Sequence, residues 1–221
     1  LSNAIEQAQR TVESRNFQTR KSVLEYDDVM NQQRNIIYGE RRKVLDGEDI
    51  HAQIMGMIKE LVSSTVADGL AGGVAENQTQ LDNALQPFEK LFMRRGTFKI
   101  EQFGGSVHND KLSEAVNEFA EKVYAAKEEA FGEGPNGLPL MREIERVIML
   151  RVVDEYWMDH IDAMDDLKQG VRLQGYGNNN PVDVYKRESL DMFEEMVSAI
   201  QDETVRRLYS VRLKKDEEVK R

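Results

Sequence analysis

The sequence predicts an all-α fold that contains one very long helix, an inserted unit of shorter helices and an antiparallel pair of long helices. Three observations support this prediction. Apolar residues recur at spacings of three and four through most of the chain, which is the period of an amphipathic helix. Glycine and proline gather in the segments between these runs. The composition is 32% charged and only 7% aromatic, which is typical of long, exposed helices.

Residues 1–45 predict the long helix, because they contain no proline and no glycine before Gly39. A stripe stepping by three and four holds Val23, Tyr26, Met30, Gln33, Ile37, Glu40 and Val44. At ~1.5 Å per residue such a helix spans roughly 60 Å, several times the average length in globular proteins. A helix of this length needs other surfaces packed along it, and this chain alone offers few.

Residues 46–140 predict an inserted unit, because their charge differs from that of the flanking segments. They carry 8 basic and 16 acidic residues, a net charge of −8, whereas residues 1–45 carry +2 and residues 141–221 carry −4. Apolar spacing predicts helices around 54–62, 81–92 and 110–131, with an irregular stretch at 96–109 that could include a short strand. Glycines and prolines at 132–139 predict a linker.

The last third predicts an antiparallel helical hairpin. The first helix runs from about 140 to a loop at 174–179, and Asn180-Pro181 predicts an N-cap with proline at the first position of the second helix. Both helices carry apolar seams with matching spacing. The seams hold Val147, Leu150, Val153, Trp157, Ile161, Met164, Leu167 and Val171 on the first helix, and Leu190, Phe193, Val197, Ile200, Thr204, Leu208 and Val211 on the second.

Composition and motifs exclude several functions. The chain has no cysteine, so it cannot form disulfides or thiolate metal sites. It has no Walker A loop, no dinucleotide-binding glycine pattern and no nucleophile motif. His51, His108 and His160 are scattered along the chain, so we expect no metal site. A net charge of −10 disfavours nucleic-acid binding, and no run of ~20 apolar residues could span a membrane.

The loop of the hairpin is the one feature that suggests a contact site. Its flanks carry four basic residues against the single acidic Asp183, and the loop places one tyrosine between two glycines. An aromatic ring on an exposed turn inside a basic collar is typical of a contact surface, although a simple connector is an equally good interpretation of these features alone. The residues are Tyr176, Lys168, Arg172, Lys186 and Arg187.

Several motifs in this order resemble the SecA family of bacterial translocation ATPases. In residues 1–45 the resemblance rests on Ala8-Gln9-Arg10, Val12 to Phe17, Leu24 to Val29 and Asn31 to Arg34. In the last third it rests on Leu150 to Trp157, His160, Ala163 to Asp165, Leu167 to Gly170, Gly175-Tyr176, Tyr185 to Glu188 and Met192-Phe193. The middle segment fits this family by position only.

The resemblance implies three segments. Residues 1–45 correspond to the helical scaffold, 46–140 to an inserted helical wing domain, and 141–221 to the continued scaffold with a two-helix finger. It also implies that Tyr176, with Lys168, Arg172, Lys186 and Arg187, contacts the SecY/SecE channel and a secretory preprotein. The long helix is expected to dock on the family's nucleotide-binding domains through Tyr26, Met30 and Arg34.

The same resemblance implies a segment without its own catalytic site or cofactor, with ATP and magnesium bound by motor domains outside it. It implies a cytoplasmic location with peripheral association at the inner face of the cell membrane. Anionic lipid is a further partner that the basic collar suggests, and nucleic acid is not expected. The alternative is a stand-alone helical scaffold or chaperone-like peptide-binding module without a role in transport.

Overall fold

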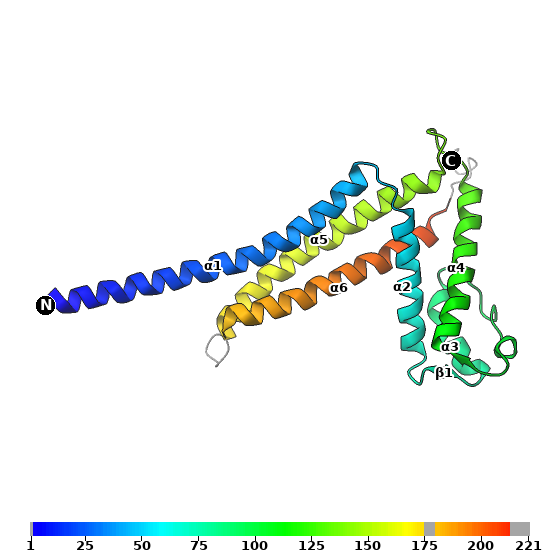
Figure 1. The fold of residues 1–221 in the computed structure, drawn as a ribbon, viewed down its shortest axis with the longest axis horizontal. Coiled ribbons are helices and arrows are strands. Elements are labelled where there is room, and N and C mark those ends of the chain that lie inside the picture. The colour runs from blue at the N-terminus through cyan, green and yellow to red at the C-terminus, as the bar shows by residue number, and fades with distance from the viewer. Residues whose placement is uncertain (1, 175–179, 213–221) are drawn as a thin grey trace, which may run out of the picture. The chain divides into compact units, whose positions relative to one another are not determined.

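The computed structural model describes residues 2–174 and 180–212. Within them the chain forms six α-helices, one 3-10 turn and a single sheet of two short strands, which confirms the all-α prediction (Figure 1). The chain divides into two compact units that interleave in sequence. The first, the scaffold unit, comprises Leu1–Lys43 and Val153–Ser198, and the second, the wing unit, comprises Val44–Val152 and Ala199–Arg221.

The scaffold unit is built from three helices. Helix α1 (Ser2–Leu45) lies along parts of α5 (Leu140–Gln174) and α6 (Pro181–Ser210), and its N-terminal portion extends beyond the helical pair (Figure 1). The predicted start of the second hairpin helix is confirmed, because the Asn180 side chain accepts a hydrogen bond from the Val182 amide at 3.2 Å and Pro181 is the first helical residue.

The wing unit contains the shorter helices α2 (His51–Gly69), α3 (Gln78–Glu89) and α4 (Asn109–Phe131), together with the 3-10 turn η1 (Ile100–Phe103). Strands β1 (Val74–Ala75) and β2 (Val107–His108) pair antiparallel, with Val74 opposite His108. Helices α2 and α4 lie side by side (Figure 1). Both helices bury apolar stripes with helical spacing: Ile54, Met57, Ile58, Leu61, Val62 and Val66 on α2, and Leu112, Val116, Ala120 and Tyr124 on α4.

Two connections hold the wing unit together closely. Gly69 at the end of α2 lies against α3, where an added Cβ would come within 2.7 Å of the Ala84 Cα. The predicted linker at 132–139 is an ordered turn, because the Gly134 amide donates to the Leu138 carbonyl at 2.7 Å and Glu133 forms a bridge with Pro139. This turn returns the chain directly into α5.

The structure corrects two details of the predicted elements. Helix α3 ends at Glu89 rather than near Phe92, because the Phe88 carbonyl accepts the amides of the next turn and ends the regular helical ladder. Val147 and Leu190, which the sequence placed in the apolar seams, are both exposed. Helical spacing predicts an apolar stripe but not its width, so residues at its edge can face outward. None of the helices in the described residues is long and apolar enough to span a membrane.

Candidate functional site

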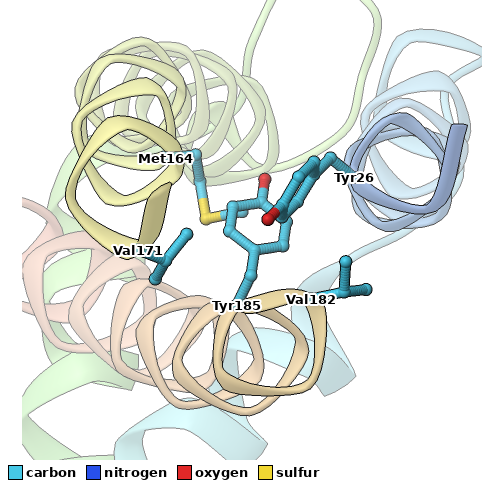
Figure 2. Close-up of a cluster of buried hydrophobic side chains, with 5 residues drawn as sticks. All are labelled: Tyr26, Met164, Val171, Val182 and Tyr185. Carbon is cyan, nitrogen blue, oxygen red and sulfur yellow. The ribbon is translucent and has the colours of Figure 1, made fainter. Parts of the chain in front are cut away.

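The centre of the scaffold unit is an apolar cluster contributed by all three helices. Tyr26 of α1 meets Tyr185 of α6 edge to face, with ring centroids 4.7 Å apart, and Met164 and Val171 of α5 complete the cluster with Val182 (Figure 2). Burial raises the pKa of Tyr185 to about 12, and the nearby carboxylates of Asp165 and Asp27 add to the shift. The cluster therefore fastens α1 to both arms of the helical pair near the predicted finger loop.

A buried polar contact joins the same three helices at a second point. The Gln33 side chain on α1 donates from Nε2 to the Ser189 carbonyl on α6 at 3.0 Å, and its Oε1 accepts from His160 Nε2 on α5 at 2.9 Å. All three residues are buried. Burial lowers the pKa of His160, so the imidazole is neutral at pH 7 and carries its proton on Nε2. One amide side chain thus connects both arms of the hairpin to the long helix.

Two ion pairs lie at the margins of this packing. Arg41 of α1 binds Asp154 of α5 through two nitrogens, with its Nε at 2.8 Å from Oδ1, and this pairing raises the pKa of the guanidinium. Lys168 of α5 lies 3.2 Å from the Asp27 carboxylate of α1 and 5.7 Å from the centroid of the Tyr26 ring. The four groups of these two ion pairs are partly exposed, so each pair contributes little stability on its own.

The described residues of the predicted basic collar lie in different environments. Lys168 is engaged with α1, whereas Lys186 and Arg187 are exposed on the first turns of α6. Tyr176 and the side chain of Arg172 lie outside the described residues. The two exposed cations of α6 are therefore the described members of the collar that present their charge to solvent.

The three residues predicted to dock on the motor domains also lie in different environments. Tyr26 is 3% exposed and, like the half-buried Met30, contributes to the apolar cluster of the scaffold unit. Arg34 is exposed and donates to Asn31 of its own helix at 3.3 Å. The contact of these residues with motor domains stays a prediction, and Arg34 is the one whose side chain faces outward.

Helix α1 has a second apolar stripe that sequence reasoning missed. Phe17, Leu24 and Tyr38 are all more than half exposed, with Phe17 at 70%. Phe17 and Leu24 are seven residues apart, so they share one face of the helix, opposite Gln33 and Tyr26. Tyr38 lies closer to the packed side, edge-on to the Trp157 ring of α5 with the centroids 6.3 Å apart. Residues 9–20 of α1 are all exposed. The seven-residue spacing was visible in the sequence and could have revealed this stripe.

The wing unit contains a cluster of polar and charged groups that sequence reasoning also missed. Glu145, on α5, is fully buried; its Oε1 accepts hydrogen bonds from the Tyr124 hydroxyl at 2.6 Å and from Arg142, and lies 3.1 Å from His51 Nδ1. Arg142 also binds Glu128 of α4. Burial and the neighbouring carboxylate raise the pKa of Tyr124, so its hydroxyl stays protonated and donates. Among the described residues, His51, Glu128 and Glu145 form a group that could hold a metal ion.

Together these features define the chain as a helical scaffold protein. The chain is a helical scaffold in which a long helix backs an antiparallel helical pair, and a separate helical unit with an acidic sequence lies between them in chain order. Comparison with known proteins then identifies the family. Residues 1–212 match the SecA Wing and Scaffold domain, and the chain belongs to this family.

Known relatives agree with this assignment. The chain is 43% identical over 221 residues, its whole length, to the protein translocase subunit SecA of Clostridium acetobutylicum, of which it covers 26%. It is 45% identical over 96% of its length to the SecA of Finegoldia magna, covering 22% of that protein. It is 47% identical over 93% of its length to the SecA of Acetivibrio thermocellus, again covering 22%. The resemblance found in the sequence is confirmed, and the chain spans about a quarter of the length of these relatives.

Proposed function

We propose that this chain is the part of a SecA protein translocase that couples ATP-hydrolysing motor domains to a two-helix finger. The proposal is supported by the family assignment and by one structural observation. Helix α1 buries Tyr26, Gln33 and Ile37 on one face and leaves Phe17 and Leu24 exposed on another. A long helix that packs on α5 and α6 with one face and exposes apolar residues on another is suited to link this helical pair to a second domain.

The open face of α1 is the proposed docking surface for the nucleotide-binding domains. Phe17 and Leu24 present apolar area, and Arg20, Lys21 and Arg34 provide neighbouring positive charge. ATP and magnesium belong to those domains in this proposal, and this chain contributes no catalytic group. In a full-length SecA that carries this segment, Phe17→Ala should reduce preprotein-stimulated ATP hydrolysis. The same change should leave the unfolding midpoint of the isolated chain unaltered, because the ring is 70% exposed.

The finger comprises α5 and α6, and the loop between them is proposed to contact the SecY/SecE channel and the preprotein through Tyr176. The absence of cysteine in this chain allows a direct test. Tyr176→Cys is introduced into a full-length SecA that carries this segment and has no other reactive cysteine, and crosslinks are sought during transport of a secretory precursor. Glu114→Cys, at an exposed position on α4, is the matched control.

A crosslink from position 176 to SecY or to the precursor, absent from position 114, supports the finger mechanism. If transport continues and position 176 gives no crosslink, the finger mechanism is wrong. The alternative of a scaffold or peptide-binding module without a transport role then becomes the better hypothesis.

Lys186 and Arg187 are proposed to bring the finger to the anionic inner face of the cell membrane, consistent with a cytoplasmic, peripherally associated protein. Replacing both with alanine should reduce co-sedimentation of the chain with phosphatidylglycerol vesicles and leave the low binding to phosphatidylcholine vesicles unchanged. Equal sedimentation of wild type and variant with anionic vesicles would contradict this part of the proposal.

A further inference from the structure

Glu145 in the wing unit has an unusual distribution of hydrogen bonds. Its carboxylate is fully buried, Oε1 accepts hydrogen bonds from Tyr124 and Arg142, and the Nδ1 atom of His51 lies 3.1 Å from the same oxygen. Its other oxygen, Oε2, is also buried and has no hydrogen-bond partner in the described part of the chain. A buried carboxylate oxygen normally finds a protein donor, a water molecule or a cation, because leaving it bare is costly.

The residues around Glu145 are those that a divalent transition metal selects. His51 of α2, Glu128 of α4 and Glu145 of α5 each offer one ligand atom, and these atoms all lie within 4.8 Å of one another. Imidazole nitrogen and carboxylate oxygen are both ligands that Zn²⁺ takes in proteins, and three protein ligands leave a fourth position for water. The three ligands come from three helices, so an ion bound there connects all three within the wing unit.

Arg142 leaves one oxygen of each of the two carboxylates available to a metal ion. Its guanidinium binds Oε1 of Glu145 and Oε2 of Glu128, so each carboxylate gives it one oxygen and keeps the other. Hydrogen-bond donors to ligating carboxylates are the usual second layer of metal sites, where they fix the orientation of the ligand. Arg142 and Tyr124 both donate to Glu145 in this way.

The charge and the open space beside the cluster also favour a cation. A cavity of about 420 Å³ is lined by His51, Tyr124 and Glu128. Glu121, Glu129 and Glu133 also line it. This cavity reaches two of the three ligands, whereas Glu145 lines a neighbouring cavity together with Arg142. The excess of carboxylates over the single guanidinium leaves the region negative. A doubly charged ion reduces this excess.

We propose that the wing unit binds one Zn²⁺ ion through His51, Glu128 and Glu145, with Arg142 and Tyr124 as positioning residues. The proposal concerns the wing unit alone and does not depend on the transport role of the family. The ion stabilises the wing unit by tying α2 and α4 to the first turns of α5.

The test uses the tag-free chain after treatment with a chelator. Isothermal titration with ZnCl₂ should show one ion bound per chain, and Co²⁺ should give visible absorption bands from nitrogen and oxygen ligands. His51→Ala and Glu128→Gln remove partly exposed ligands and should each weaken Zn²⁺ binding at least about tenfold. His108→Ala and Glu114→Gln change exposed residues outside the cluster and should leave the affinity unchanged.

Tyr124→Phe tests the positioning role, because it removes the hydroxyl that donates to Glu145 and keeps the ring. We expect weaker Zn²⁺ binding while the Co²⁺ bands keep their positions, since the ligands are the same. The proposal is overturned if the chain shows no saturable Zn²⁺ binding, or if His51→Ala binds as tightly as His108→Ala.

Discussion

Replacing Gln33 with leucine tests whether the buried polar contact holds α1 on the helical pair. Leucine has a similar volume but removes both ends of the contact, so His160 Nε2 loses its acceptor. The Ser189 carbonyl lies inside α6, where the helical ladder also reaches it. The principal cost is therefore one buried donor without a partner, about 1–3 kcal/mol. Added apolar burial offsets up to about 1 kcal/mol of this.

We therefore expect Gln33→Leu to lower the free energy of unfolding by about 1–2 kcal/mol. For a chain of this size this corresponds to a fall in Tm of roughly 2–8 °C. Urea unfolding followed by tryptophan fluorescence measures it, because Trp157 is the only tryptophan and its ring lies 5.6 Å from that of His160. Gln32→Leu is the matched control, since Gln32 is the same residue type at the neighbouring, exposed position.

A double-mutant cycle sharpens this prediction. His160→Phe removes the donor and keeps a ring between Trp157 and Phe193, so the variant carrying both changes leaves no polar group stranded. It should cost less than the sum of the two single changes. The reasoning is refuted if Gln33→Leu is as stable as wild type while Gln32→Leu is also neutral. Apolar packing alone would then account for the attachment of α1.

Three further predictions concern stability. Gly69→Ala should destabilise the chain by about 1–3 kcal/mol, because the new Cβ meets the backbone of Ala84 at 2.7 Å. Thermal unfolding measures this effect. Gly72→Ala is the control in the same assay, since a Cβ added at Gly72 would have no atom within 4 Å. Lys127→Met should cost about 1–3 kcal/mol in urea unfolding, because its ammonium donates to two of the last carbonyls of α6 at 2.6 and 2.7 Å, and an unchanged midpoint would contradict the capping role. Burial lowers the pKa of His160 below its ordinary 6.5, so below about pH 6.5 the unfolded chain binds a proton that the folded chain does not. The free energy of unfolding should therefore decrease as the pH falls below about 6.5. Unfolding curves at pH 5, 6 and 7 measure this decrease, which should be smaller in His160→Gln.

Helical spacing predicted most of the fold because each helix is amphipathic and the breaks between helices hold glycine or proline. The prediction of helix ends was wrong where apolar residues continue at helical spacing after the backbone has left the helix. Helix α3 ends at Glu89 although the apolar spacing continues to Phe92, whose ring packs on Phe119 and Tyr209 from the turn that follows the helix. Periodicity shows which residues share a face and does not show where the backbone leaves the helix.

The site was predicted less completely, since a pattern identifies a face but not the partner that covers it. Tyr26 and Met30 were correctly placed on one stripe of α1, yet the structure packs that stripe against α5 and α6 of the same chain. The wing cluster was invisible for another reason. His51 and Glu145 are separated by 94 positions, and a glutamate in a helical segment that also holds Arg142, Glu143 and Arg146 normally indicates a solvent-exposed face.

The buried polar groups of the two units share a physical role that apolar packing cannot supply. Apolar side chains attract without direction, so a helix shifted by one turn keeps much of its contact with a neighbour. Such a shift would separate Gln33 from Ser189 and His160 in the scaffold unit, and would separate Glu145 from Tyr124 in the wing unit. Each stranded group costs about 1–3 kcal/mol or more. The polar contacts therefore fix the register of helices whose apolar stripes alone would permit several alignments.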